Sequence, residues 1–130
     1  IAVAQLVPIY PDIHLTILGK IKPGGDIDKL LGNLDISDHL SFVSGLETYE
    51  VVNLYAKASV VVVPSIYEGF GLPAGEAMAC GVPVISTDGG ALHEVVGECG
   101  IIIPTKNQNA ISDAITQLFE DPEKRQVLSL

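Results

Sequence analysis

The stretch VVVVPSIYEGFGLPAGEAMACGVPVIS, residues 60–86, constrains the fold more than any other part of the sequence. It opens with β-branched apolar residues at 60–63 that show no polar alternation, which is typical of a strand buried on both faces of a parallel sheet. Pro64 ends this run and a glycine-rich loop follows. Pro73 and Gly81 stand where a helix begins and ends. The stretch is therefore predicted to form a strand, a loop, a short helix and a second strand.

The rest of the chain repeats this alternation of strands and helices. Further strands are predicted at 14–18, 39–43 and 100–103, and helices at 1–6, 26–31, 47–57, 74–80, 92–96 and 107–120. The connections between strands are too long for hairpins, which favours parallel pairing. We expect an α/β protein with a Rossmann-like parallel sheet and helices on both of its faces.

Glycines follow the ends of four predicted strands, at Gly19, Gly45, Gly69 with Gly71, and 89–90. In an open parallel sheet, ligands bind outside the carboxyl ends of the strands. The four loops are therefore expected to share one edge that binds a ligand. For any single loop, a tight turn with no ligand explains the glycine equally well.

The composition limits the class of protein. The chain has 130 residues with 48% hydrophobic content, enough for one core, and we expect a single domain. Sixteen acidic against seven basic residues give a net charge of -9. This field repels polyanions, so nucleic acid is not expected as a partner, and an anionic ligand needs a local binding device.

The cysteines and the apolar runs indicate where the protein works. Cys80 and Cys99 lack the CxxC spacing of a redox or zinc site and are expected to be reduced thiols. No run of about 18 apolar residues and no signal peptide is visible, so a cytoplasmic location is expected. Because the chain starts at Ile1 and residues 1–6 resemble a helix interior, we expect the natural start to lie upstream.

Several familiar catalytic patterns are missing from the sequence. His14, His39 and His93 are far apart and no HExxH occurs, so no metal site is expected. Ser65 and Ser86 do not stand in a GxSxG elbow, which gives little support to a serine nucleophile. No Walker A lysine is present either.

Two carboxylates flank the central loop. Glu68 precedes Gly69 and Gly71, whose backbone can approach a ligand closely, and Glu76 is expected in the first turn of the helix. The amides at a helix N-terminus bind anions without any basic residue. A carboxylate can accept two hydrogen bonds from a diol. Together these groups fit a sugar nucleotide, with phosphate on the amides and hydroxyls on the glutamates.

The residues EGFGLP at 68–73, EAMA at 76–79 and GVPVI at 81–85 resemble the E-x7-E signature of retaining GT-B glycosyltransferases, the GT4-like group. The resemblance covers nearly all of the chain and is strongest over residues 55–104. It implies transfer of a glycosyl group from a nucleoside-diphosphate sugar to an acceptor, with retention of configuration. The nucleotide sugar is a substrate, and neither a cofactor nor a metal is expected.

The resemblance also implies roles for single residues. Glu76 would bind the ribose hydroxyls of the donor, and Glu68, the candidate catalytic residue, would contact the transferred sugar near the reaction centre. The main chain at Gly69, Phe70, Gly71 and Leu72 would meet the sugar and the phosphates. The loop with Ser44, Gly45 and Leu46 would lie near the base.

Parts that the family normally has are expected outside this sequence. A strand and a loop whose Arg and Lys clamp the diphosphate would lie upstream of Ile1, and its position in the sheet would be between the strands at 14–18 and 60–63. The acceptor domain and a closing C-terminal helix are also expected elsewhere. Residues 1–130 would then be a single truncated GT-B C-terminal domain, inactive alone. Its exposed sheet edges would favour self-association.

The partners that follow from this interpretation are a nucleotide-sugar donor and an acceptor that is a glycan, a lipid or a small molecule. The full-length protein is expected to be cytoplasmic, either free or held at the membrane periphery. Two other functions stay open. One is a sugar-nucleotide epimerase of GT-B architecture. The other is a flavodoxin-like signalling or binding module, which would need clustered aspartates after its first strand and a lysine after its fifth.

Overall fold

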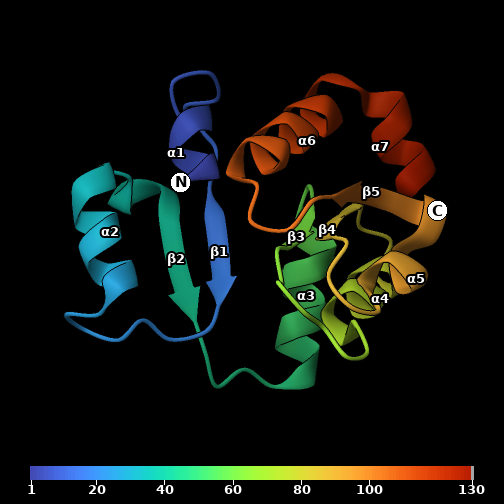
Figure 1. The fold of residues 1–130 in the computed structure, drawn as a ribbon, viewed down its shortest axis with the longest axis horizontal. Coiled ribbons are helices and arrows are strands. Elements are labelled where there is room, and N and C mark those ends of the chain that lie inside the picture. The colour runs from blue at the N-terminus through green and yellow to red at the C-terminus, as the bar shows by residue number, and fades with distance from the viewer. Residues whose placement is uncertain (130) are drawn as a thin grey trace. The chain divides into compact units, whose positions relative to one another are not determined.

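The computed structural model describes residues 1–129. The chain forms two compact units, Ile1–Leu46 and Glu47–Leu130, drawn in Figure 1 from blue to teal and from green to red. The assignment of residues 1–130 to one domain stays a prediction. None of the helices that the structure describes is long and apolar enough to cross a membrane.

The first unit contains two parallel strands joined by a helical crossover. Its elements are α1 (Ala2–Leu6), β1 (Leu15–Leu18), α2 (Asp26–Leu34), the 3₁₀ turn η1 (Ser37–His39) and β2 (Leu40–Val43). Leu15 lies opposite Leu40 and Leu18 opposite Val43. The amide of Gly19 donates a hydrogen bond to the Val43 carbonyl over 2.8 Å, so the loops after both strands start at the same edge.

Both histidines of this unit make local contacts beside the strands. The His14 Nε2 atom lies 2.7 Å from the Ser41 hydroxyl, and His39 Nδ1 donates a hydrogen bond of 2.8 Å to the Ile13 carbonyl. These contacts hold the beginnings of the two strands together.

The second unit contains three parallel strands in the order β3-β4-β5. Its elements are α3 (Thr48–Lys57), β3 (Val61–Val63), α4 (Leu72–Ala79), β4 (Val84–Thr87), α5 (Leu92–Val96), the turn η2 (Gly97–Cys99), β5 (Gly100–Ile103), α6 (Gln108–Glu120) and α7 (Pro122–Leu128). In register, Val84 is paired with Val61 on one side and with Gly100 on the other.

Helices cover both faces of this sheet, as the sequence predicts (Figure 1). Val84 belongs to a buried cluster with Tyr55 of α3, Ala74 of α4 and Leu92 of α5. Ile85, the next residue along β4, is fully buried too, and its side chain alternates to the face covered by α6. The central strand, β4, is therefore buried on both faces, which explains why it begins with two consecutive apolar residues.

The elements differ from the predictions at their ends. The helix predicted at 26–31 continues through Gly32 to Leu34 and ends at Asp35, a non-glycine residue with φ 49°. Helix α4 begins at Leu72, two residues earlier than predicted. Helix α7 was not predicted. It starts after Asp121, whose carboxylate accepts a hydrogen bond from the Lys124 amide over 2.8 Å.

Candidate functional site

The loop between β3 and α4 carries the first of the two glutamates. Glu68 is partly buried, and the Ser65 hydroxyl donates a hydrogen bond to its Oε2 atom over 3.2 Å. The hydroxyl of the buried Thr87, at the end of β4, donates a hydrogen bond to the Ser65 carbonyl. The amide of Ala91 donates to the Glu68 carbonyl over 2.9 Å. The loop after β4 thus fixes the backbone on which Glu68 stands.

Two glycines allow this close contact between the loops. A β-carbon on Gly90 would collide with the carbonyl oxygen of Glu68, and Gly90 has a left-handed φ of 65°. A β-carbon on Gly89 would collide with the Ile66 carbonyl and lie 2.9 Å from that of Ser65. The predicted glycine loops after β3 and β4 therefore share one edge of the sheet. The meeting of these loops with those at Gly19 and Gly45 stays a prediction.

Helix α4 begins at this edge. Gly71 is its N-cap, with a φ of 66°, and a β-carbon there would approach Leu92 Cδ2 to 3.2 Å. Pro73 stands in the first turn, as predicted. The first amides of a helix have no partners within the helix, and they carry the positive end of its dipole. An anion binding site beside Gly71 is chemically reasonable in a chain with net charge -9.

Glu76 is exposed on α4, but not in the first turn, so this part of the prediction was wrong. The left-handed Gly71 ends the loop early and starts the helix at Leu72, which moves Glu76 into the second turn. On either side of it, Ala74 and Ala77 are fully buried. They hold the helix against the core while the carboxylate faces outward.

Tyr55 of α3 is buried and belongs to the same cluster as Ala74 and Ala77, which stand on either side of Glu76. The pKa of Tyr55 lies above its ordinary value, first because the side chain is buried and then because of the negative charge of Glu76. The thiol of Cys80, one helical turn from Glu76, acts in the same direction. No sequence pattern indicated that Tyr55 packs beside this part of α4.

Three other predicted donor-binding residues of the second unit are exposed to solvent. Gly69 is exposed, Phe70 keeps 81% of its surface exposed, and Leu72 keeps 66%. Tyr67, beside Glu68, is 77% exposed. The loop therefore has a fixed backbone and a free apolar tip.

The remaining predicted contacts lie in the first unit, directly after β2. Ser44 and Gly45 are exposed and Leu46 is partly buried. Gly45 has a φ of 67°, so this turn requires a residue that tolerates the left-handed region. Their approach to the glutamates stays a prediction.

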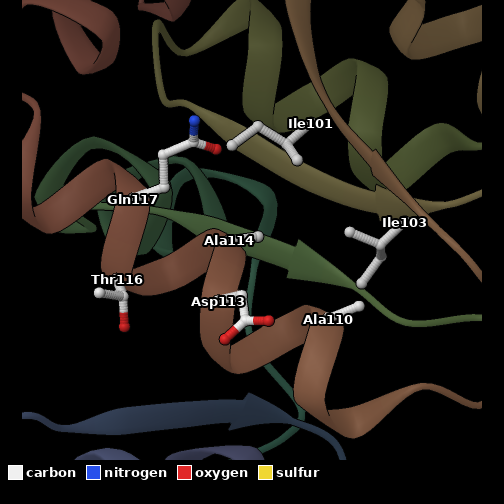
Figure 2. Close-up of a pocket in the computed structure, with 7 residues that line it drawn as sticks. All are labelled: Ile101, Ile103, Ala110, Asp113, Ala114, Thr116 and Gln117. Carbon is white, nitrogen blue, oxygen red and sulfur yellow. The ribbon is translucent and has the colours of Figure 1, made fainter.

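The second unit has two hollows whose lining residues include neither Glu68 nor Glu76. One, of about 540 Å³, lies between β5 and α6, and Figure 2 shows Ile101 and Ile103 facing the helix. The other, of about 220 Å³, is lined by Pro64, Thr87, Pro104, Lys106, Asn107, Gln108 and Ile111. It lies at the carboxyl ends of the three strands. No pattern in the sequence indicated either hollow.

Within residues 1–129, no three His, Cys, Asp or Glu side chains gather closely enough to hold a metal ion. The loop after β3 carries the carboxylate of Glu68, and α4 carries the carboxylate of Glu76 and the amides of its first turn. Carboxylates accept hydrogen bonds from sugar hydroxyls, and helix amides bind phosphate oxygens.

The parallel α/β fold, together with the loops after β3 and β4, defines a domain of the GT-B glycosyltransferase class. The chain belongs to the family described as glycosyl transferases group 1, whose model matches residues 1–129.

Relatives and a solved structure agree with this family. The chain is 39% identical over 126 residues to the MMP alpha-(1->4)-mannosyltransferase of Mycolicibacterium hassiacum, covering 95% of this chain and 30% of the relative. It is 30% identical over 132 residues to the GDP-mannose-dependent monoacylated alpha-(1-6)-phosphatidylinositol monomannoside mannosyltransferase of Corynebacterium glutamicum, covering 95% and 34%. The C-terminal domain of LpcC, a glycosyl transferase group 1 family protein of Francisella tularensis, matches with a TM-score of 0.85 and 27% identity, covering 98% and 70%. The chain thus spans about a third of the length of the two mannosyltransferases.

Proposed function

We propose that this chain is the donor-binding, C-terminal domain of a retaining, GT4-like glycosyltransferase that uses a nucleoside-diphosphate sugar. The observation that carries the proposal is the fixed backbone at Glu68. The contacts from Thr87 and Ala91 hold this loop beside the N-terminus of α4, while Glu76 stays exposed on the same helix. The name of the Corynebacterium glutamicum relative, which specifies GDP-mannose, supports a nucleotide sugar as the donor.

In the proposed complex, each group takes the part of the donor that suits its chemistry. The Glu76 carboxylate accepts hydrogen bonds from the two ribose hydroxyls. The amides at Gly69–Leu72 and the dipole of α4 hold the phosphates and the sugar. The turn at Ser44–Leu46 lies near the base.

Glu68 is placed near the anomeric carbon in this proposal. Its negative charge stabilises the positive charge that develops on an oxocarbenium-like sugar as the bond to the leaving diphosphate breaks. The Ser65 hydroxyl donates a hydrogen bond of 3.2 Å to Oε2 and so restrains the rotamer of this carboxylate. Transfer with retention at one face of the sugar then needs no protein nucleophile.

The proposal extends to the whole enzyme. Since the chain spans 30% of the mannosyltransferase from Mycolicibacterium hassiacum, we propose that an acceptor domain and a basic diphosphate clamp lie outside residues 1–130. Activity then requires the full-length protein, which works in the cytoplasm or at the membrane periphery. Without the missing strand, the free edges of β1 and β3 favour self-association of the isolated chain.

A calorimetric screen of UDP-, GDP- and ADP-sugars with the full-length protein tests the proposal. One of these donors should bind, and Glu76→Ala should weaken it about tenfold or more, because a ligand hydrogen bond to a charged group is lost. Glu123→Ala, which removes an exposed glutamate from α7, is the matched control and should bind normally. Equal affinity of wild type and Glu76→Ala would contradict the ribose role.

An acceptor-dependent assay separates transfer from epimerisation. A transferase releases nucleoside diphosphate in step with glycosylated acceptor and retains the anomeric configuration, which proton NMR of the product shows. Conversion of the donor sugar without any acceptor would instead identify an epimerase.

A further inference from the structure

We propose that Ser65 is a positioning residue that selects which oxygen of the Glu68 carboxylate faces the donor sugar. Its hydroxyl holds Oε2, which leaves Oε1 for the sugar. This inference rests on the proposed function, because it takes Glu68 to stand near the anomeric carbon. Ser65, which stands in no nucleophile elbow, then acts through Glu68 and not on the substrate itself.

The short segment from Ser65 to Glu68 is anchored at both ends by β4 and the loop after it. The hydroxyl of Thr87 donates a hydrogen bond to the Ser65 carbonyl, and the amide of Ala91 donates one to the Glu68 carbonyl over 2.9 Å. The ring of Pro64 also fixes φ at the residue before the segment. The backbone of both residues is therefore held in place without any ligand.

Within this segment, a side-chain hydrogen bond joins the two anchored residues. The Ser65 hydroxyl donates it to Glu68 Oε2 over 3.2 Å, and both residues are partly buried, so that it is less exposed to competing water. In residues 1–129 the structure shows no other hydrogen-bond partner on this carboxylate. The distance is long for two oxygens, and hydrogen bonds of this kind shorten when a ligand fills the site.

This bond decides the orientation of the carboxylate. The last torsion of a glutamate side chain is broad and two-fold, so a free carboxylate readily exchanges the positions of its two oxygens. With Oε2 held by Ser65, the exchange is prevented and Oε1 keeps one position. A charge that is already in place needs no reorganisation when positive charge develops on the sugar.

Ser65→Thr and Ser65→Val in the full-length protein test the inference, because the two side chains have the same shape and only threonine keeps the hydroxyl. With the best-binding donor among UDP-glucose, GDP-mannose and ADP-glucose, kcat in the acceptor-dependent assay should be about three- to tenfold lower for Ser65→Val than for Ser65→Thr. The donor Kd from calorimetry should be equal, because the charge on the sugar develops only in the transition state. Thr48→Val makes the same chemical change at an exposed position of α3 and should alter neither value.

A second background shows whether Ser65 acts through Glu68. When Glu68→Ala is added to both variants, their kcat values should become equal, because the hydroxyl then has no carboxylate to orient. Thermal melting checks that the variants are folded. If the added methyl group destabilises both of them, Ser65→Ala compared with wild type measures the same loss of kcat.

The outcomes separate this inference from the function on which it rests. Equal kcat values for Ser65→Thr and Ser65→Val, or the same ratio in the Glu68→Ala background, would overturn the role of Ser65 alone. A donor affinity that falls as much as kcat would also overturn it, because the hydroxyl would then support the bound donor in general. Normal kcat of Glu68→Ala would overturn the proposed role of Glu68 and the positioning role with it.

Discussion

The amide of Ala91 donates a hydrogen bond to the carbonyl oxygen of Glu68, 2.9 Å away, and so joins the loop after β4 to the loop that carries the first glutamate. Gly90 stands beside this bond, where a β-carbon would collide with the same oxygen. The position of the Glu68 backbone therefore depends on Gly90, which is 22 positions further along the chain.

Replacement of Gly90 should disturb both the fold and the site. Gly90→Ala places a β-carbon against the Glu68 carbonyl and strains a φ of 65°, so we expect the free energy of unfolding to fall by about 2 to 4 kcal/mol. Donor binding should weaken as well. Urea unfolding and calorimetry measure the two effects.

Gly32→Ala is the matched control for Gly90→Ala. Gly32 lies inside α2, where an added β-carbon meets nothing within 4 Å, and Ala is the better helix former. Its free energy of unfolding should rise by about 0.5 to 1 kcal/mol. Equal effects at the two glycines would show that close packing of the loops is not what Gly90 provides.

The hydroxyl of Ser65 should matter for activity more than for stability. Ser65→Ala removes the hydrogen bond to Glu68 Oε2 and frees the carboxylate to rotate, so kcat of the full-length enzyme should fall about three- to tenfold. The free energy of unfolding should change by less than about 1 kcal/mol. Ser59→Ala, at an exposed position before β3, should leave both values unchanged. A normal kcat in Ser65→Ala would show that Glu68 needs no such restraint.

Thr87, in contrast, should matter for stability more than for activity. Thr87→Val keeps the shape of the side chain and removes the donor that bonds the Ser65 carbonyl, at a residue that is only 2% exposed. The carbonyl then lacks this partner, and we expect a loss of about 1 to 3 kcal/mol in the free energy of unfolding. Chemical denaturation of Thr87→Val beside wild type measures it. A loss below about 0.5 kcal/mol would mean that the loops are held without this bond.

Alkaline pH should weaken the packing around Tyr55. Burial and the charge of Glu76 raise its pKa above the ordinary 10.0, with a smaller effect from Cys80. The folded state then binds the phenolic proton more tightly than the unfolded state, so stability is complete below pH 10 and falls as the pH rises through the folded pKa.

This pH dependence can be isolated by subtraction. The difference in the free energy of unfolding between wild type and Tyr55→Phe should shrink as the pH rises from about 9 to 11, because only wild type loses this proton. Denaturant titrations at several pH values measure the difference. A constant difference across this range would show that the Tyr55 proton is not linked to folding.

Local patterns predicted much of the fold of the second unit. The β-branched run at 60–63 became β3 at Val61–Val63, and Pro73 and Gly81 marked a helix that the structure confirms. The start of α4 could not be placed, because a φ of 66° at Gly71 is a property of the folded loop. Helix α7 was missed although Asp121 and Pro122 supply an N-cap and a first-turn proline.

The candidate site was predictable only as far as its residue types. Glu68 and Glu76 are visible in the sequence because they flank glycines. The packing of Tyr55 of α3 with Ala74 and Ala77 of α4, beside Glu76, is tertiary, and no local period indicates it. The contact between Gly90 and Glu68 likewise depends on two neighbouring strands ending together.

In the loop after β3, the base has a fixed backbone and the tip has exposed side chains. Substitutions at the base and at the tip should therefore differ in their effect on stability. Substitutions at the base, where carbonyl groups meet Thr87 and Ala91, are limited by folding. The side chains of Tyr67 and Phe70 lie in solvent, and replacing exposed residues usually shifts stability by no more than about 0.5 kcal/mol. Residues at the tip can therefore change during evolution and suit new ligands, while the two glutamates keep their positions. One fold can then acquire different ligand specificities.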